Sequence, residues 1–235
     1  MMESYESNRG RIIVTADDFG LNAQSNDNIF FLLELGKINR VAVMVHGKIS
    51  PQEIERLLRS RVKLDIHLDV LHEFEQGKKK RAGAFGRGLD FLWKIAKGEL
   101  AFKKVRADWE NQIEMFHQIF GKNPDGINSH EHVHLFPPFF KIALSLRQKY
   151  AIPYIRFGDS FFLPHHNLVS YILHILRKIN LPACTKNSCV SSGWLVSIDW
   201  IQDVEKFLAE LPQGTTEVVC HPELNDDFVK IEKYF

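Results

Sequence analysis

The chain has 235 residues, of which 45% are hydrophobic and 25% are charged, as in a folded globular protein rather than a disordered or fibrous one. The formal net charge of +1 gives no reason to expect binding to nucleic acid or to an anionic membrane. The three cysteines lack CxxC spacing, no apolar run reaches the roughly 18 residues of a membrane span, and the N-terminus shows no signal peptide, so we expect a cytoplasmic protein.

Strands and helices alternate along the first part of the chain. A β-branched run predicts a buried strand over residues 11–16, and apolar side chains at helical spacing predict a helix over residues 23–36. Residues 41–45 and 62–70 predict two further buried strands. Between them, Ser50-Pro51 predicts the start of a helix, with serine as its cap and proline at its first position.

The same alternation returns after residue 104. The predicted strands cover residues 126–129, 152–157 and 216–220, and the predicted helices cover residues 105–120, 137–150, 168–179 and 199–211. This alternation indicates an α/β fold with a largely parallel sheet and helical crossovers, formed as a single domain over residues 1–235. Residues 73–104, rich in Gly, Lys and Arg, interrupt the pattern as an insertion or lid, and their basic run at residues 78–81 is typical of a solvated loop.

Six polar residues lie at or just past the carboxyl ends of the predicted strands. They are Asp17, Asp18, His67, His130, Arg156 and His221. In a (β/α) barrel these strand ends converge on one face of the molecule, where active sites lie. The sequence therefore predicts that these widely separated residues form one site.

The residue types at these positions suit a divalent cation. Carboxylate oxygen and imidazole nitrogen can supply three ligands and leave a position open for water, whose pKa the cation lowers. In an extended backbone the adjacent side chains of Asp17 and Asp18 leave in opposite directions, so we expect one ligand and one base or orienting group. A helix-capping turn is the structural alternative for this pair.

The histidines strengthen the prediction of a metal site. His130, His132 and His134 alternate with other residues, so an extended segment would put all three on one face. His67 alone is typical of a buried histidine, and its place at a strand end favours a functional role. His221 can donate a proton near neutral pH, and Arg156 either orients a carboxylate or forms a surface salt bridge.

Four segments together resemble the YdjC-like carbohydrate deacetylases, which remove acetyl groups from N-acetylated sugars such as chitooligosaccharides. The matching segments are Thr15-Ala16-Asp17-Asp18-Phe19-Gly20-Leu21, Asp65-Ile66-His67-Leu68, Ser129-His130-Glu131-His132-Val133-His134-Leu135-Phe136-Pro137 and Val219-Cys220-His221-Pro222. They follow one another in the order of the family. The family usually has Asp where this chain has Asn128, which predicts an altered contact to the histidines.

The resemblance implies a deformed (β/α) barrel with one divalent ion, magnesium or zinc. By motif, Asp18, His67 and His130 correspond to the metal ligands, and Asp17 to the general base that deprotonates metal-bound water. His221 corresponds to the acid for the leaving amine, and Arg156 to a support for the acidic pair. The other two histidines of the third segment, His132 and His134, are expected in the pocket or behind the ligands.

The leading prediction is a metal-dependent hydrolase in which metal-bound water attacks the amide of an N-acetylated sugar. Its partner is a small-molecule substrate, with no nucleic acid or membrane, and assembly into a homo-oligomer is left open. One alternative is a metal-binding, carbohydrate-binding protein without turnover, motivated by the end of the sequence at Phe235, where family members continue with a further helix and strand. Another is a metal-dependent phosphoesterase that uses the basic run at residues 78–81 to hold its substrate.

Overall fold

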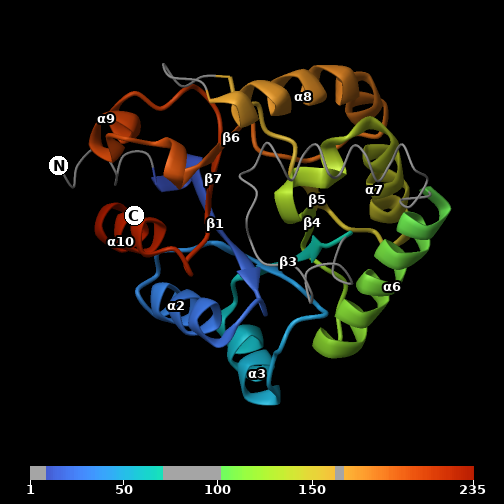
Figure 1. Ribbon diagram of the computed structural model, residues 1–235, viewed down its shortest axis with the longest axis horizontal. Coiled ribbons are helices and arrows are strands. Elements are labelled where there is room, and N and C mark those ends of the chain that lie inside the picture. Colours follow the sequence, from blue (N-terminus) through green and yellow to red (C-terminus); the bar gives the residue numbers. More distant parts are fainter. Residues whose placement is uncertain (1–8, 71–101, 162–166) are drawn as a thin grey trace.

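The computed structural model describes residues 9–70, 102–161 and 167–235. In this part of the chain, seven parallel strands form one sheet in the order β5-β4-β3-β2-β1-β7-β6. The strands are β1 (Ile12–Phe19), β2 (Arg40–Val43), β3 (Lys63–Leu68), β4 (Gly126–Ser129), β5 (Tyr154–Ile155), β6 (Trp194–Ser197) and β7 (Thr216–Cys220). The strands occupy the centre of the molecule and the helices surround them (Figure 1).

Helices connect the strands and cover the sheet from outside. They are α2 (Ala23–Glu34), α3 (Pro51–Ser60), α6 (Phe102–Phe120), α7 (Pro137–Lys149), α8 (Leu168–Lys186), α9 (Val204–Ala209) and α10 (Asn225–Tyr234). The predicted start of α3 is confirmed, because Ser50 and Glu53 form a reciprocal capping box and Pro51 is the first helical residue. Within the described ranges, no helix is long and apolar enough to cross a membrane.

The two edges of the sheet approach each other. Parallel bridges join Tyr154 to Val190 and Asp159 to Trp194, so the chain after β5 lies beside the chain leading into β6. Backbone hydrogen bonds of 2.9 Å from Asp159 to Gly193 and from Leu195 to Asp159 support this approach. The sheet is therefore curled into a deformed (β/α) barrel, and the predicted fold class is confirmed.

The two faces of the curled sheet differ in chemistry. Because successive side chains of a strand point to opposite faces, Val14 and Ile66 belong to the hydrophobic core, whereas their neighbours Thr15 and Asp65 make polar contacts inside the barrel. Buried aromatic side chains of the helices, such as Trp109 of α6, complete the apolar layer. Polar side chains therefore gather in the barrel interior.

Several predicted elements need correction. The helix expected over residues 199–211 is instead a 3-10 turn, η3 (Ile198–Trp200), followed by the short α9, which begins after the capping residue Asp203. Strand β6 and helix α10 were not predicted, because four strand residues carry too little periodicity and α10 follows the last motif directly. Most of the expected insertion, residues 73–104, lies outside the described residues.

Candidate active site

A distortion of β1 brings both adjacent aspartates to the same place. The pairing of β1 with β2 shifts register between Ala16 and Phe19, and Asp18 has a φ of 63°, in the left-handed region. Asp17 and Asp18 are each 2% exposed, and oxygens of both lie within 4.0 Å of the His67 ring. The side chains therefore do not diverge as an extended strand would require.

Asp18 lies between two histidines. Its Oδ1 is 3.2 Å from His67 Nε2 and 3.1 Å from His130 Nδ1, and the two imidazole rings are nearly perpendicular, at 87°. One atom from each residue lies within 4.8 Å of the others, so this group could hold a metal ion. Burial raises the pKa of Asp18, but the neighbouring His130 and His67 outweigh it and hold the pKa well below its usual value.

The ring of His67 is oriented by Asn128. Its Nδ1 lies 2.6 Å from Asn128 Oδ1, and because an amide oxygen only accepts, Nδ1 carries the proton. Nε2 faces Asp18 Oδ1 at 3.2 Å and, among the described residues, has no hydrogen bond of acceptable geometry. A histidine held at one nitrogen, with the other directed at a carboxylate ligand, is the usual arrangement in a metal site.

Asp17 is paired with Arg156. The guanidinium donates two hydrogen bonds of 2.7 Å, one to each carboxylate oxygen, and both side chains are buried. Burial raises the pKa of Asp17, but the charge of Arg156 opposes this and brings the pKa to about 2. Asp17 is therefore ionised at neutral pH, and the interpretation of Arg156 as a surface salt bridge is wrong.

The guanidinium of Arg156 has a second carboxylate partner. Its Nε donates to Glu217 Oε1 at 2.8 Å, and the same oxygen accepts from Thr15 Oγ1 at 2.9 Å. The other oxygen, Oε2, accepts from Tyr154 Oη at 2.5 Å. Glu217 has no exposed surface, so all these contacts lie inside the barrel.

The histidine-rich segment is not extended. Residues 130–135 form a kinked 3-10 turn in which Glu131 and His132 have φ values of 51° and 55°. The three imidazoles therefore do not share one face, because each successive residue turns the chain. His130 reaches Asp18, while His134 points into the protein.

His134 has a structural role, with both ring nitrogens in contact with other protein groups. Its Nδ1 lies 2.8 Å from Ser129 Oγ and its Nε2 lies 2.9 Å from the carbonyl oxygen of Arg156. A carbonyl only accepts, so Nε2 carries the proton and the imidazole is neutral. Burial lowers the pKa of His134 to about 3, which is consistent with this neutral form. His134 thus ties the turn to the backbone that carries Arg156.

His132 lies near the charged groups of the site. Its Nδ1 is buried and has no hydrogen-bond partner among the described residues. Burial, followed by the positive charge of Arg156, holds the pKa of His132 well below its usual value. A neutral imidazole with an unused nitrogen is thereby placed near the charged groups.

His221 follows β7 and is held by Asp227. Its backbone N–H donates to Asp227 Oδ2 at 2.9 Å, and its ring Nδ1 lies 3.6 Å from the same oxygen. Burial lowers the pKa of His221, but Asp227 and then Asp17 and Asp18 raise it, to about 9. The imidazole is therefore protonated at neutral pH and is partly exposed, at 31% of its side chain.

All six residues at the predicted strand ends therefore belong to one polar region of the barrel. Reasoning from the sequence missed Glu217, Tyr154 and Asp227. Glu217 carried a signal, since it is a single charged residue within the apolar strand Thr216–Cys220, and a buried charge there requires a partner. Asp227, on the helix after His221, carried none.

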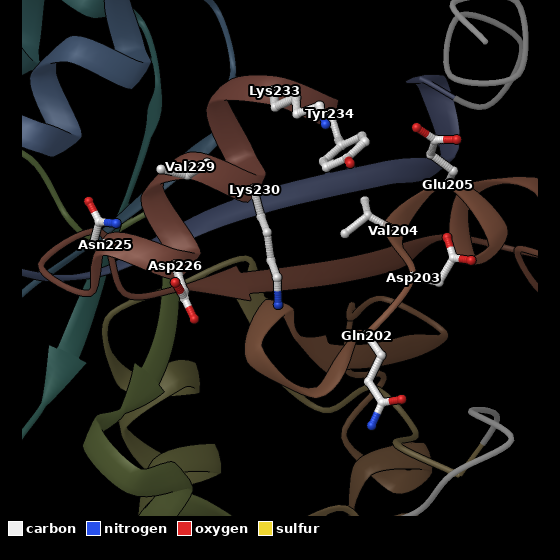
Figure 2. A pocket seen from close by; sticks show the side chains of 10 residues that line it. All are labelled: Gln202, Asp203, Val204, Glu205, Asn225, Asp226, Val229, Lys230, Lys233 and Tyr234. Carbon is white, nitrogen blue, oxygen red and sulfur yellow. The ribbon is translucent and has the colours of Figure 1, made fainter.

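A cavity of about 580 Å³ lies elsewhere, between the residues that lead into α9, the start of α9, and α10 (Figure 2). Its lining includes Asp203, Glu205 and Lys230 but none of the residues at the predicted strand ends. Lys230 Nζ donates to the carbonyl oxygen of Ile201 at 3.0 Å, so its charge is directed at the backbone. This cavity is distinct from the candidate active site.

Known proteins resemble this chain over most of its length. A carbohydrate deacetylase from Mus musculus is 25% identical over 156 residues, which are 63% of this chain and 50% of that protein. A chitooligosaccharide deacetylase from Citrobacter koseri is 24% identical over 230 residues, 95% of this chain and 85% of that protein. The chain thus spans about half the length of the mouse relative and most of the bacterial one.

A solved structure has the same fold. A proposed cellobiose-phosphate cleavage protein from Enterococcus faecalis V583 superposes with a TM-score of 0.61 at 18% identity, covering 93% of this chain and 83% of that one. The sequence profile of the YdjC-like protein family matches residues 11–233, a range that contains every residue of the candidate site. The chain belongs to the YdjC-like protein family.

Proposed function

We propose that the protein is a metal-dependent hydrolase that removes the acetyl group from N-acetylated sugars or oligosaccharides. The observation that carries the proposal is the Asp18, His67 and His130 group beside an ionised Asp17 held by Arg156. The deacetylase names of relatives that match 63% and 95% of the chain support the choice of reaction.

The triad fits a divalent ion. The Asp18 carboxylate and the imidazoles of His67 and His130 offer the donor set of a catalytic site with an open position, and Asn128 fixes the His67 ring at its other nitrogen. One ion, magnesium or zinc, is expected, and the two imidazoles favour zinc. When bound, such an ion lowers the pKa of a coordinated water and polarises the amide carbonyl.

Asp17 and His221 carry out the proton transfers of the reaction. Asp17 is ionised and takes a proton from the water that attacks the acetamide carbon, while Arg156 keeps its carboxylate oriented. His221 is protonated at neutral pH and gives its proton to the nitrogen as the C–N bond breaks. One C–O bond forms, one C–N bond breaks, and the products are acetate and a free amino sugar.

The test is product analysis with N-acetylglucosamine and its oligomers, with and without chelator. We expect equal amounts of acetate and free amine, lost on chelation and restored by added metal. Metal binding without acetate release across the panel would favour a binding protein without turnover. Phosphate release from phosphate esters would favour a phosphoesterase, whose expected basic run at residues 78–81 lies outside the described residues.

A further inference from the structure

We infer that Glu217 is a positioning residue of this site, which fixes the guanidinium of Arg156 and, through it, the carboxylate of Asp17. The inference rests on the proposed role of Asp17 as the base. Glu217 lies outside the four segments that resemble the family, and its link to Asp17 runs through Arg156.

Arg156 is held along two edges of its planar guanidinium. The terminal nitrogens donate to Asp17, each at 2.7 Å, and the Nε donates to Glu217 at 2.8 Å. A guanidinium bound only at its terminal nitrogens can still turn about the bonds of its own side chain. The Nε contact removes that freedom, so the position of the Asp17 carboxylate depends on Glu217.

Glu217 is itself fixed by two hydroxyl groups. Thr15 of β1 donates to Oε1 at 2.9 Å and Tyr154 of β5 donates to Oε2 at 2.5 Å. Glu217 lies on β7, so a single buried carboxylate ties together three strands that carry or adjoin Asp17 and Arg156. This is the arrangement expected of a group that supports a catalytic residue from behind.

The guanidinium of Arg156 is paired with two buried carboxylates, Asp17 and Glu217. Loss of Glu217 would leave Asp17 as its remaining ion-pair partner, so the guanidinium could turn and the Asp17 carboxylate would lose its fixed orientation.

The barrel offers a matched control in Asp65. This carboxylate is equally buried and accepts from Arg40, at 2.8 Å from Nε and 2.5 Å from a terminal nitrogen. Arg40 stacks on the Tyr154 ring, 4.2 Å from its centre, and donates to Asp65 and to the carbonyl oxygen of Asp125. Asp65→Asn and Glu217→Gln thus remove the same charge from the same interior, and only the second changes a residue that is hydrogen-bonded to Arg156.

The experiment compares kcat, KM, metal affinity and Tm for wild type, Glu217→Gln and Asp65→Asn. We expect both variants to lower Tm, because each disturbs a buried ion pair. Only Glu217→Gln should lower kcat, by roughly 10- to 100-fold, with KM and metal affinity unchanged, since a displaced base costs rate and not binding. In combination with Arg156→Lys, its effect should be smaller than the product of the two single effects.

Equal kcat values for Glu217→Gln and Asp65→Asn would overturn the inference. Tyr154→Phe, which keeps Glu217 but removes the hydrogen bond to Oε2, serves as the second variant if Glu217→Gln does not fold, and it should lower kcat in the same direction. An inactive wild type would contradict the proposed function only. In that case the NMR signal of the Arg156 Nε–H tests the role of Glu217. We expect this proton to exchange rapidly with water in Glu217→Gln and to be protected from exchange in Asp65→Asn. Protection in both variants would contradict the inference.

Discussion

Asp17 and Arg156 lie 139 residues apart in the sequence and are joined by two parallel hydrogen bonds of 2.7 Å inside the barrel. This contact keeps the buried carboxylate of Asp17 ionised and fixes its orientation. It also links β1 to the chain that follows β5. The role proposed for Asp17 depends on it.

Asp17→Asn should abolish most of the activity without emptying the metal site. The amide cannot accept the proton of the attacking water, so kcat should fall by about 10²- to 10⁴-fold. Metal affinity should be retained, because Asp18, His67 and His130 are unchanged. Calorimetric metal titration beside acetate release checks both halves, and acetate release at the wild-type rate would exclude Asp17 as the base.

Asn128→Ala should weaken metal binding, since it removes the group that fixes the His67 ring. Loss of such a supporting contact typically lowers metal affinity about 10- to 100-fold. Asn128→Asp is the matched variant, and it should retain or increase affinity, because a carboxylate at this position makes the imidazole a stronger donor. Equal affinities for the wild type and Asn128→Ala would show that His67 is not a ligand held in this way.

The activity should have an alkaline limb set by His221. A general acid acts in its protonated form, and the pKa of His221 is raised to about 9, so activity should fall as the pH rises through that value. Asp227 favours the imidazolium, so Asp227→Asn should move the limb to lower pH. The pH profile of kcat for the two proteins measures this, and a limb that does not move would separate His221 from proton transfer.

Arg156→Met should destabilise the protein in a pH-dependent way. It leaves the buried carboxylates of Asp17 and Glu217 without a cation, at a cost of about 3–5 kcal/mol in the free energy of unfolding at pH 7. The pKa of Asp17 is depressed from 3.8 to about 2, so its share of the stability is complete above 3.8 and is lost as the pH falls through 2.

Urea unfolding of wild type and Arg156→Met at several pH values tests this. The difference in the free energy of unfolding between the two proteins should become smaller as the pH is lowered from 4 towards 2. A difference that stays constant over this range would mean that Arg156→Met destabilises the protein through lost packing and not through lost ion pairs.

The sequence predicted the fold and the gathering of the site, because both depend on repeated patterns. Alternating strands and helices require a parallel sheet, and the carboxyl ends of its strands carry Asp17, His67, His130 and His221. The local distortions of the backbone in the site could not be predicted from these patterns. The register shift at Asp18 and the kink at His132 depend on contacts with other strands, and periodicity along one segment does not contain those contacts.

The contacts of the buried polar residues around the site could not be predicted from the sequence either. Glu217 reads as a single charge in an apolar strand, and only the curl of the sheet shows that it meets Arg156 rather than solvent. Asn128 was linked to the histidines by its place beside them, and the structure shows that its partner is His67 on the neighbouring strand.

Acetate release should depend on a metal ion bound by Asp18, His67 and His130. The most direct measurement titrates zinc or magnesium into chelator-treated protein with an N-acetylglucosamine oligomer as substrate, recording bound metal and released acetate in the same samples. We expect acetate release to rise with bound metal, to saturate at one ion per chain, and to be absent from His67→Ala. Full acetate release from metal-free protein, or from His67→Ala without bound metal, would contradict this expectation.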